Sequence, residues 1–169
     1  MTNIDDGFTI SEEVRHTLPP ERKKAVIRNL TGFILNHAEI LFSYLHGSFL
    51  ENSSFRDVDV AVYFDRTVPA ERRLDLCLDL AVALSRLAGF PVDVQALNEA
   101  SPGFRYHATR GLVLSSRDEE KRYDFLERTW MTYFDYQPVL RQIRADLLAG
   151  LDTSPAKQPA GKDRSRETA

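Results

Sequence analysis

The residues best suited to chemistry lie between His46 and Tyr63, where a glycine–serine pair precedes two closely spaced aspartates. Asp57 and Asp59 are separated by one residue, in a stretch where valines alternate with other residues. Alternate side chains of a β-strand point to one face, which places the two carboxylates side by side, about 7 Å apart along the chain. Adjacent carboxylates repel each other and lose hydration on burial unless a hard divalent cation binds them. The spacing therefore predicts a metal site.

A third aspartate, Asp93, has the same surroundings, because it also lies between two valines. Aspartate is uncommon in strands, so its recurrence at three such positions indicates a function. If the strand that carries Asp93 pairs beside the strand that carries Asp59, the three carboxylates converge and can bind one or two Mg²⁺ ions through oxygen. The preceding Gly47–Ser48 turn would then offer backbone N–H groups and a hydroxyl to phosphate.

Length and charge restrict the class of protein. A chain of 169 residues is the size of one domain and can bury about 70% of its unfolded surface. Its net charge of −3 argues against a dedicated nucleic-acid binder, which usually has a basic face. With Cys77 as its one cysteine, the chain offers neither a disulfide framework nor a zinc cluster, and we expect this thiol to be a small buried hydrophobe.

The sequence also predicts where the protein resides. It has no apolar stretch long enough to span a membrane, and Met1 to Asp6 lack a basic region followed by an apolar run. We therefore expect no membrane association and a cytoplasmic protein.

Hydrophobic periodicity predicts the elements that must position the acids. The expected strands cover residues 40–45, 58–64, 92–97 and 112–114. The expected helices cover about 21–36, 69–88, 101–111 and a long amphipathic stretch from 118 to 147. Pro138 is expected to kink or divide that last helix, and Gly89 to end the second one.

This order of elements predicts an α+β fold, an α/β sandwich in which a small mixed sheet packs on helices. One layer of helices would suffice to cover the apolar face of so small a sheet. The chain is expected to divide into an N-terminal segment (1–20), one domain that includes the C-terminal helices (21–150) and a disordered tail (151–169). The tail prediction rests on its Pro, Ala, Lys, Arg and Ser residues, which include no large apolar side chain after Leu151.

Together, the glycine–serine pair and the acids resemble the motif of the DNA polymerase β-like nucleotidyltransferase superfamily. Within it, the chain is similar to the minimal nucleotidyltransferases, which are often antitoxins of HEPN-domain ribonuclease toxins. The motif reads Gly47-Ser48, a spacer, Asp57-Val58-Asp59 and a later Asp93. The resemblance extends from about residue 21 to residue 148.

The resemblance implies an Mg²⁺-dependent transfer of AMP from ATP to a hydroxyl, with release of pyrophosphate. Asp57 and Asp59 would bind two Mg²⁺ ions, and Asp93 would complete one of these sites and help to deprotonate the acceptor. Gly47 and Ser48 would bind the β- and γ-phosphates. The implied acceptor is a tyrosine of a separate HEPN-domain toxin, which the modification would silence.

The spacer departs from the commoner family pattern. Residues 49–56 make it shorter than usual, and Leu50 and Glu51 stand where alanine and arginine are common. Arg56 replaces the usual serine before the first aspartate. Either the shorter loop holds the triphosphate differently, or Arg56 supplies the missing positive charge and takes part in binding the nucleotide.

Simpler interpretations remain open for several of these residues. The aspartate pair would be solvated on an edge strand, Ser48 would only cap the next segment, and Arg56 would be a surface cation. Arg105, Tyr106 and Arg110 fit an exposed helix face better than a phosphate or base contact. The aromatic residues near the C-terminus fit a core or a partner interface: Trp130, Tyr133, Phe134 and Tyr136.

Two other functions also remain open. A binding-only antitoxin would mask its toxin by contact and would not need the acids. A small-molecule transferase of the aminoglycoside type would keep the chemistry and change the acceptor, although such enzymes generally carry an additional substrate-binding region.

Overall fold

A computed structural model describes residues 14–151 in two units, the first ending at Tyr133 and the second beginning at Phe134. Most of the predicted N-terminal segment and nearly all of the predicted tail lie outside the described residues. The domain boundaries at residues 21 and 150 therefore stay a prediction.

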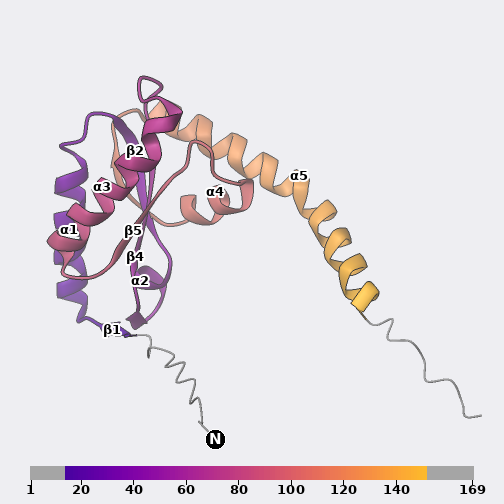
Figure 1. Cartoon of the computed structure of the whole chain (residues 1–169), viewed down its shortest axis with the longest axis horizontal. Helices are drawn as coiled ribbons and strands as arrows, with labels where there is room; N and C mark the ends of the chain where they lie inside the picture. Colours follow the sequence, from indigo (N-terminus) through magenta and orange to yellow (C-terminus); the bar gives the residue numbers. More distant parts are fainter. Residues whose placement is uncertain (1–13, 152–169) are drawn as a thin grey trace, which may run out of the picture. The chain divides into compact units, whose positions relative to one another are not determined.

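A four-stranded mixed sheet forms the centre of the first unit, and its strand order is β5-β4-β2-β6. Figure 1 labels β2, β4 and β5 of this sheet. β2 runs antiparallel to both β4 and β6, whereas β4 and β5 are parallel. The mixed sheet and the α+β class are thus confirmed. The strands are β2 (Ile40–His46), β4 (Val58–Phe64), β5 (Val92–Ala96) and β6 (Leu112–Ser116).

Helices α1 (Pro20–Ile34) and α3 (Ala70–Ala88) cover one face of this sheet. Their apolar sides pack on the β4 valines, which are essentially inaccessible, as the alternation predicted. Gly89 ends α3 in the left-handed conformation, with φ of 75°, a role that glycine fills without steric cost. Cys77 on α3 is 4% exposed, and burial raises its thiol pKa to about 11, so it is the expected small hydrophobe.

The opposite face of the sheet is covered by α4 (Pro102–Thr109) and the first turns of α5 (Glu119–Leu151), as Figure 1 shows for α4. A single helical layer is therefore not enough. The second face of the sheet also carries large apolar side chains, which must be buried by further helices. These side chains form a second buried cluster of Phe42, Tyr44, Ala61, Leu97 and Ala108, with Phe104 and Phe125 packed against it.

Three short elements were not expected from the sequence. α2 (Ser48–Glu51) follows the glycine–serine turn, and β1 (His16–Thr17) pairs antiparallel with β3 (Ser54–Phe55). Elements of two to four residues are too short to produce a periodic pattern. Of the two outcomes expected at Pro138, the division is wrong, because α5 continues through this residue as one helix, and a kink there stays a prediction.

Candidate functional site

The glycine–serine turn lies against the second aspartate of the motif. Gly47 has a φ of +77°, which favours glycine, and a Cβ added there would lie 2.2 Å from Asp59 Oδ2. Only glycine fits at position 47, because the Cβ atom of any other residue would collide with the Asp59 carboxylate. The side chain of Ser48 does not cap α2, whose N-cap is Gly47.

Strand register brings the acids together across the sheet. Asp59 on β4 pairs with Asp93 on the parallel strand β5 and with His46 on the antiparallel strand β2. The predicted pairing of the two aspartate strands is thus confirmed. Asp57 immediately precedes β4, and its charge also acts on Asp59.

The pKa of Asp59 reflects both its burial and the two carboxylates near it. Burial, followed by the charges of Asp57 and Asp93, raises the pKa of this half-buried carboxyl to about 6, and Arg56 opposes the rise. On β2, burial lowers the pKa of His46, against the opposing charges of Asp93 and Glu51. An added cation would relieve the repulsion between the acids.

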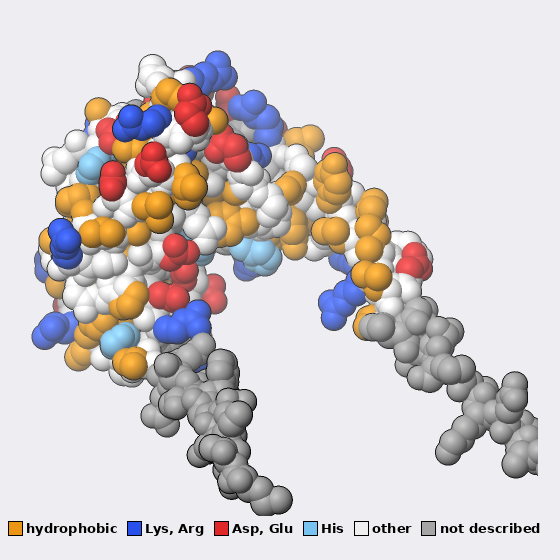
Figure 2. Space-filling view, viewed as in Figure 1, with side chains coloured by type: hydrophobic (Ala, Val, Ile, Leu, Met, Phe, Trp, Pro, Cys, Tyr) orange, Lys and Arg blue, Asp and Glu red, His pale blue; other side chains and the backbone are white. Residues whose placement is uncertain are grey.

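The other two aspartates are hydrogen-bonded to neighbours on their own segments. Arg56 donates to Asp57 at 3.2 Å, and Gln95 donates to Asp93 at 2.8 Å. Within residues 14–151, no group of three acidic, histidine or cysteine side chains is close enough to hold a metal ion as it stands. The donor set consists of carboxylate oxygens, which is the chemistry that Mg²⁺ prefers. Figure 2 shows acidic side chains gathered on the surface beside the position of α2.

Lys23 on α1 supports this site, although no sequence pattern predicted its role. Its ammonium donates to the carbonyl oxygens of Phe49 and Asn52, at 2.7 and 2.8 Å, and lies over the rings of Phe49 and Phe55. It therefore fixes the end of α2, directly after the glycine–serine turn. In the sequence, Lys23 is one of two adjacent lysines on a charged helix start, where surface lysines are common.

The downstream candidates serve the fold of the first unit. Arg105 donates to the carbonyl oxygens of Leu97 and Asn98, so it fixes the connection between β5 and α4 and is half-buried. Tyr106 stacks on Tyr133 with ring centres 3.9 Å apart, and Arg110 lies over the Tyr106 ring.

Comparisons with known proteins agree with this geometry. The family described as polymerase beta, nucleotidyltransferase matches residues 28–120, more than half of the chain. A search of curated proteins finds no match.

The described residues include no helix that is long and apolar enough to cross a membrane.

Solved structures of similar fold come from toxin–antitoxin complexes. One is a chain from the complex of a tri-AMPylated Shewanella oneidensis HEPN toxin with its MNT antitoxin, 22% identical, with a TM-score of 0.56 over 75% of this chain and 98% of that one. Another is a chain from the MntA–HepT complex, 20% identical, with a TM-score of 0.56 over 77% and 99%. A third, from a toxin–antitoxin structure with AMP-PNP, is 23% identical, with a TM-score of 0.54 over 78% and 99%.

Replacing Gly47 with alanine tests the contact with Asp59. We expect a loss of at least about 2 kcal/mol in the free energy of unfolding, from the left-handed backbone and the collision. Gly32→Ala is the matched control, because nothing lies within 4 Å of its added Cβ on exposed α1 surface. That control is expected to stabilise the protein by about 0.5–1 kcal/mol. Equal effects in urea denaturation would contradict the prediction.

The raised pKa of Asp59 predicts how stability changes with pH. The folded protein retains this proton up to about pH 6, whereas the unfolded chain loses it near the ordinary value of 3.8. Stability should therefore fall as pH rises through this window. In EDTA at pH 8, Asp59→Asn should stabilise the protein by about 1–2 kcal/mol, a shift of two pKa units reduced for partial exposure. Thermal unfolding should show that the stabilisation by Asp59→Asn disappears near pH 4. If the variant is stabilised equally at pH 4 and pH 8, the raised pKa of Asp59 is refuted.

The two adjacent lysines provide a matched test of the α2 contact. Lys23→Met should reduce the free energy of unfolding by about 2 kcal/mol, because two carbonyl groups lose a charged donor. Lys24→Met removes only an exposed ion pair with Glu21 and should change the free energy of unfolding by at most about 0.5 kcal/mol. Denaturant titrations of both variants would measure the difference, and indistinguishable midpoints would show that Lys23 does not stabilise the fold.

The glycine turn against Asp59, the strand register that adds Asp93 and the match over residues 28–120 lead to one conclusion: this chain belongs to the polymerase beta nucleotidyltransferase family.

Proposed function

We propose that this nucleotidyltransferase transfers AMP from ATP to a hydroxyl group, with a tyrosine of a HEPN-domain toxin as the acceptor. The observation that carries the proposal is the register of Asp59 with Asp93, beside the Gly47–Ser48 turn. The AMPylated toxin and the AMP-PNP in the structures of similar fold support the choice of donor and acceptor. Because the reaction consumes ATP, we place it in the cytoplasm.

In the proposed site, Asp57, Asp59 and Asp93 would hold Mg²⁺, two ions in all. When bound, the metal supplies positive charge to the triphosphate and lowers the pKa of the acceptor hydroxyl. Asp59 releases its proton near pH 6 without metal, so its carboxylate is available as a ligand at neutral pH. Gly47 and Ser48 contribute a backbone N–H and a hydroxyl to the β- and γ-phosphates, and Arg56 contributes positive charge.

The chemical step is a substitution at the α-phosphorus of ATP. The acceptor oxygen forms a bond to this phosphorus while the bond to the bridging oxygen of pyrophosphate breaks. The hydroxyl proton passes to a carboxylate, for which Asp93 is the proposed base because it is the most exposed of the three acids.

A second candidate is a binding-only antitoxin, which would mask its toxin by contact. Exposed apolar residues of the second unit favour a partner surface, because soluble proteins seldom expose so many together. They include Val139, Leu140, Ile143 and Leu147, each at least 50% exposed. Figure 2 shows hydrophobic side chains along this part of α5.

Labelled ATP separates the two candidates. With Mg²⁺ and a HEPN-domain partner, we expect label on a partner tyrosine, and Asp57→Asn with Asp59→Asn should slow labelling at least about 100-fold. Asp75→Asn, an exposed acid on α3, is the control and should label normally. Tandem mass spectrometry would identify the modified residue.

The remaining outcomes exclude one candidate or the other. If the double variant still neutralises the toxin fully, the protein acts by contact. If ATP labels neither protein nor any small acceptor, the transferase proposal fails.

A further inference from the structure

A cavity of about 500 Å³ lies at the carboxyl ends of β4 and β5, at the other end of these strands from the acids. Its walls come from the end of β4, the β5–α4 connection and the first turns of α5 within the first unit. Ala61, which is completely buried, lies between Asp59 and Tyr63 on the same face of β4 and packs with Leu97 and Ala108. The apolar cluster therefore separates this cavity from the nucleotidyl-transfer site.

One part of the cavity wall is aromatic. The rings of Tyr63 and Phe125 both line it, with centres 5.0 Å apart, and Tyr63 stacks on Phe42 at 4.6 Å. The guanidinium of Arg105 lies 5.4 Å from the centre of the Phe125 ring. Such a wall accommodates a flat apolar group, and the volume is in the range of small-molecule sites.

The remaining wall carries charges of both signs, with more basic than acidic side chains. Four basic side chains line the cavity against two acidic ones: Arg66, Arg105, Lys121 and Arg128 against Asp65 and Asp124. The guanidinium of Arg66 forms no hydrogen bond or ion pair with residues 14–148. The pKa of Lys121 is raised, first by its hydrogen bond and ion pair with Asp118 and then by the charge of Asp65, and the charge of Arg66 opposes this rise. Lys121 pairs with Asp118 at 2.9 Å and Arg128 lies 4.0 Å from Asp124, so Arg66 is the cavity cation that an anion would pair with first.

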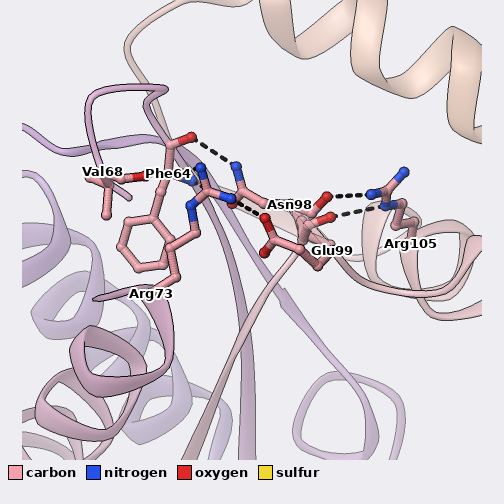
Figure 3. Close-up of polar contacts among 7 residues, drawn as sticks. Phe64, Val68, Arg73, Asn98, Glu99 and Arg105 are labelled. Carbon is pink, nitrogen blue, oxygen red and sulfur yellow. Dashed lines mark hydrogen bonds and ion pairs between the residues drawn. The ribbon is translucent and has the colours of Figure 1, made fainter. Parts of the chain in front are cut away.

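Hydrogen bonds fix the frame of this cavity (Figure 3). The Asn98 side chain donates to and accepts from the backbone of Phe64, at 3.0 and 2.9 Å, and joins the ends of the two strands. Arg73 donates to the Val68 carbonyl oxygen and pairs with Glu99. A site with a fixed frame binds its ligand without the cost of ordering these segments.

We propose that this cavity binds a small anion with a flat apolar portion, of the nucleoside phosphate class, as a second site separate from nucleotidyl transfer. The phosphate faces Arg66 and Lys121, and the flat portion lies against Tyr63 and Phe125. This inference does not depend on the proposed acceptor or on catalysis.

AMP is the probe, titrated calorimetrically into the full chain in EDTA, so that no divalent cation supports binding at the acids. We expect measurable binding that weakens at least tenfold in Arg66→Glu, because this substitution replaces an attraction with a repulsion. Arg72→Glu, an exposed cation on α3, is the matched control and should bind AMP normally. Inorganic phosphate should bind more weakly than AMP, because it lacks the flat portion.

The location of the site is tested separately by photolabelling with 8-azido-AMP in EDTA. The crosslinked peptide should contain Tyr63 or Phe125, and Asp57→Asn with Asp59→Asn should leave the labelling unchanged. The proposal is overturned by absence of AMP binding, by equal binding in Arg66→Glu, by phosphate binding as tight as that of AMP, or by label confined to residues 46–59. None of these results depends on whether the protein modifies a toxin.

Discussion

The parallel pairing of β4 with β5 is the constraint on which the site depends. It places Asp93 beside Asp59, and the antiparallel neighbour β2 adds His46 and the glycine turn. This arrangement is unfavourable for Asp59, because burial and then repulsion from Asp57 and Asp93 raise its pKa. The fold tolerates the repulsion because the reverse faces of the same strands bury valines, so a shift in register would expose the core.

The sequence predicted those parts of the fold that alternation or helical periodicity encodes. Val58 to Phe64 and Val92 to Ala96 alternate clearly, so their pairing and the convergence of Asp59 with Asp93 could be anticipated. The short spacer could not be interpreted in the same way, because α2 and β3 have too few residues for a period. The contact of Lys23 with α2 could not be predicted, because it depends on two carbonyl groups that lie 26 and 29 residues away in the chain.

The second helical layer shows a different limit of sequence reasoning. The apolar character of Phe42 and Tyr44 was evident, but which helix would cover them depends on the connection from β5 to α4. That connection is fixed by Arg105, whose guanidinium binds two backbone carbonyl groups. A charged residue on a short helix is normally assigned to solvent, so its structural role required the tertiary contacts.

The contact between Gly47 and the Asp59 carboxylate also limits how this sequence can change. A side chain at position 47 needs the space that the carboxylate occupies, so the two positions cannot vary independently. Loss of the acid would remove the collision and leave only the backbone preference for glycine. The turn and the acid thus behave as one unit under mutation, although eleven residues separate them in the chain.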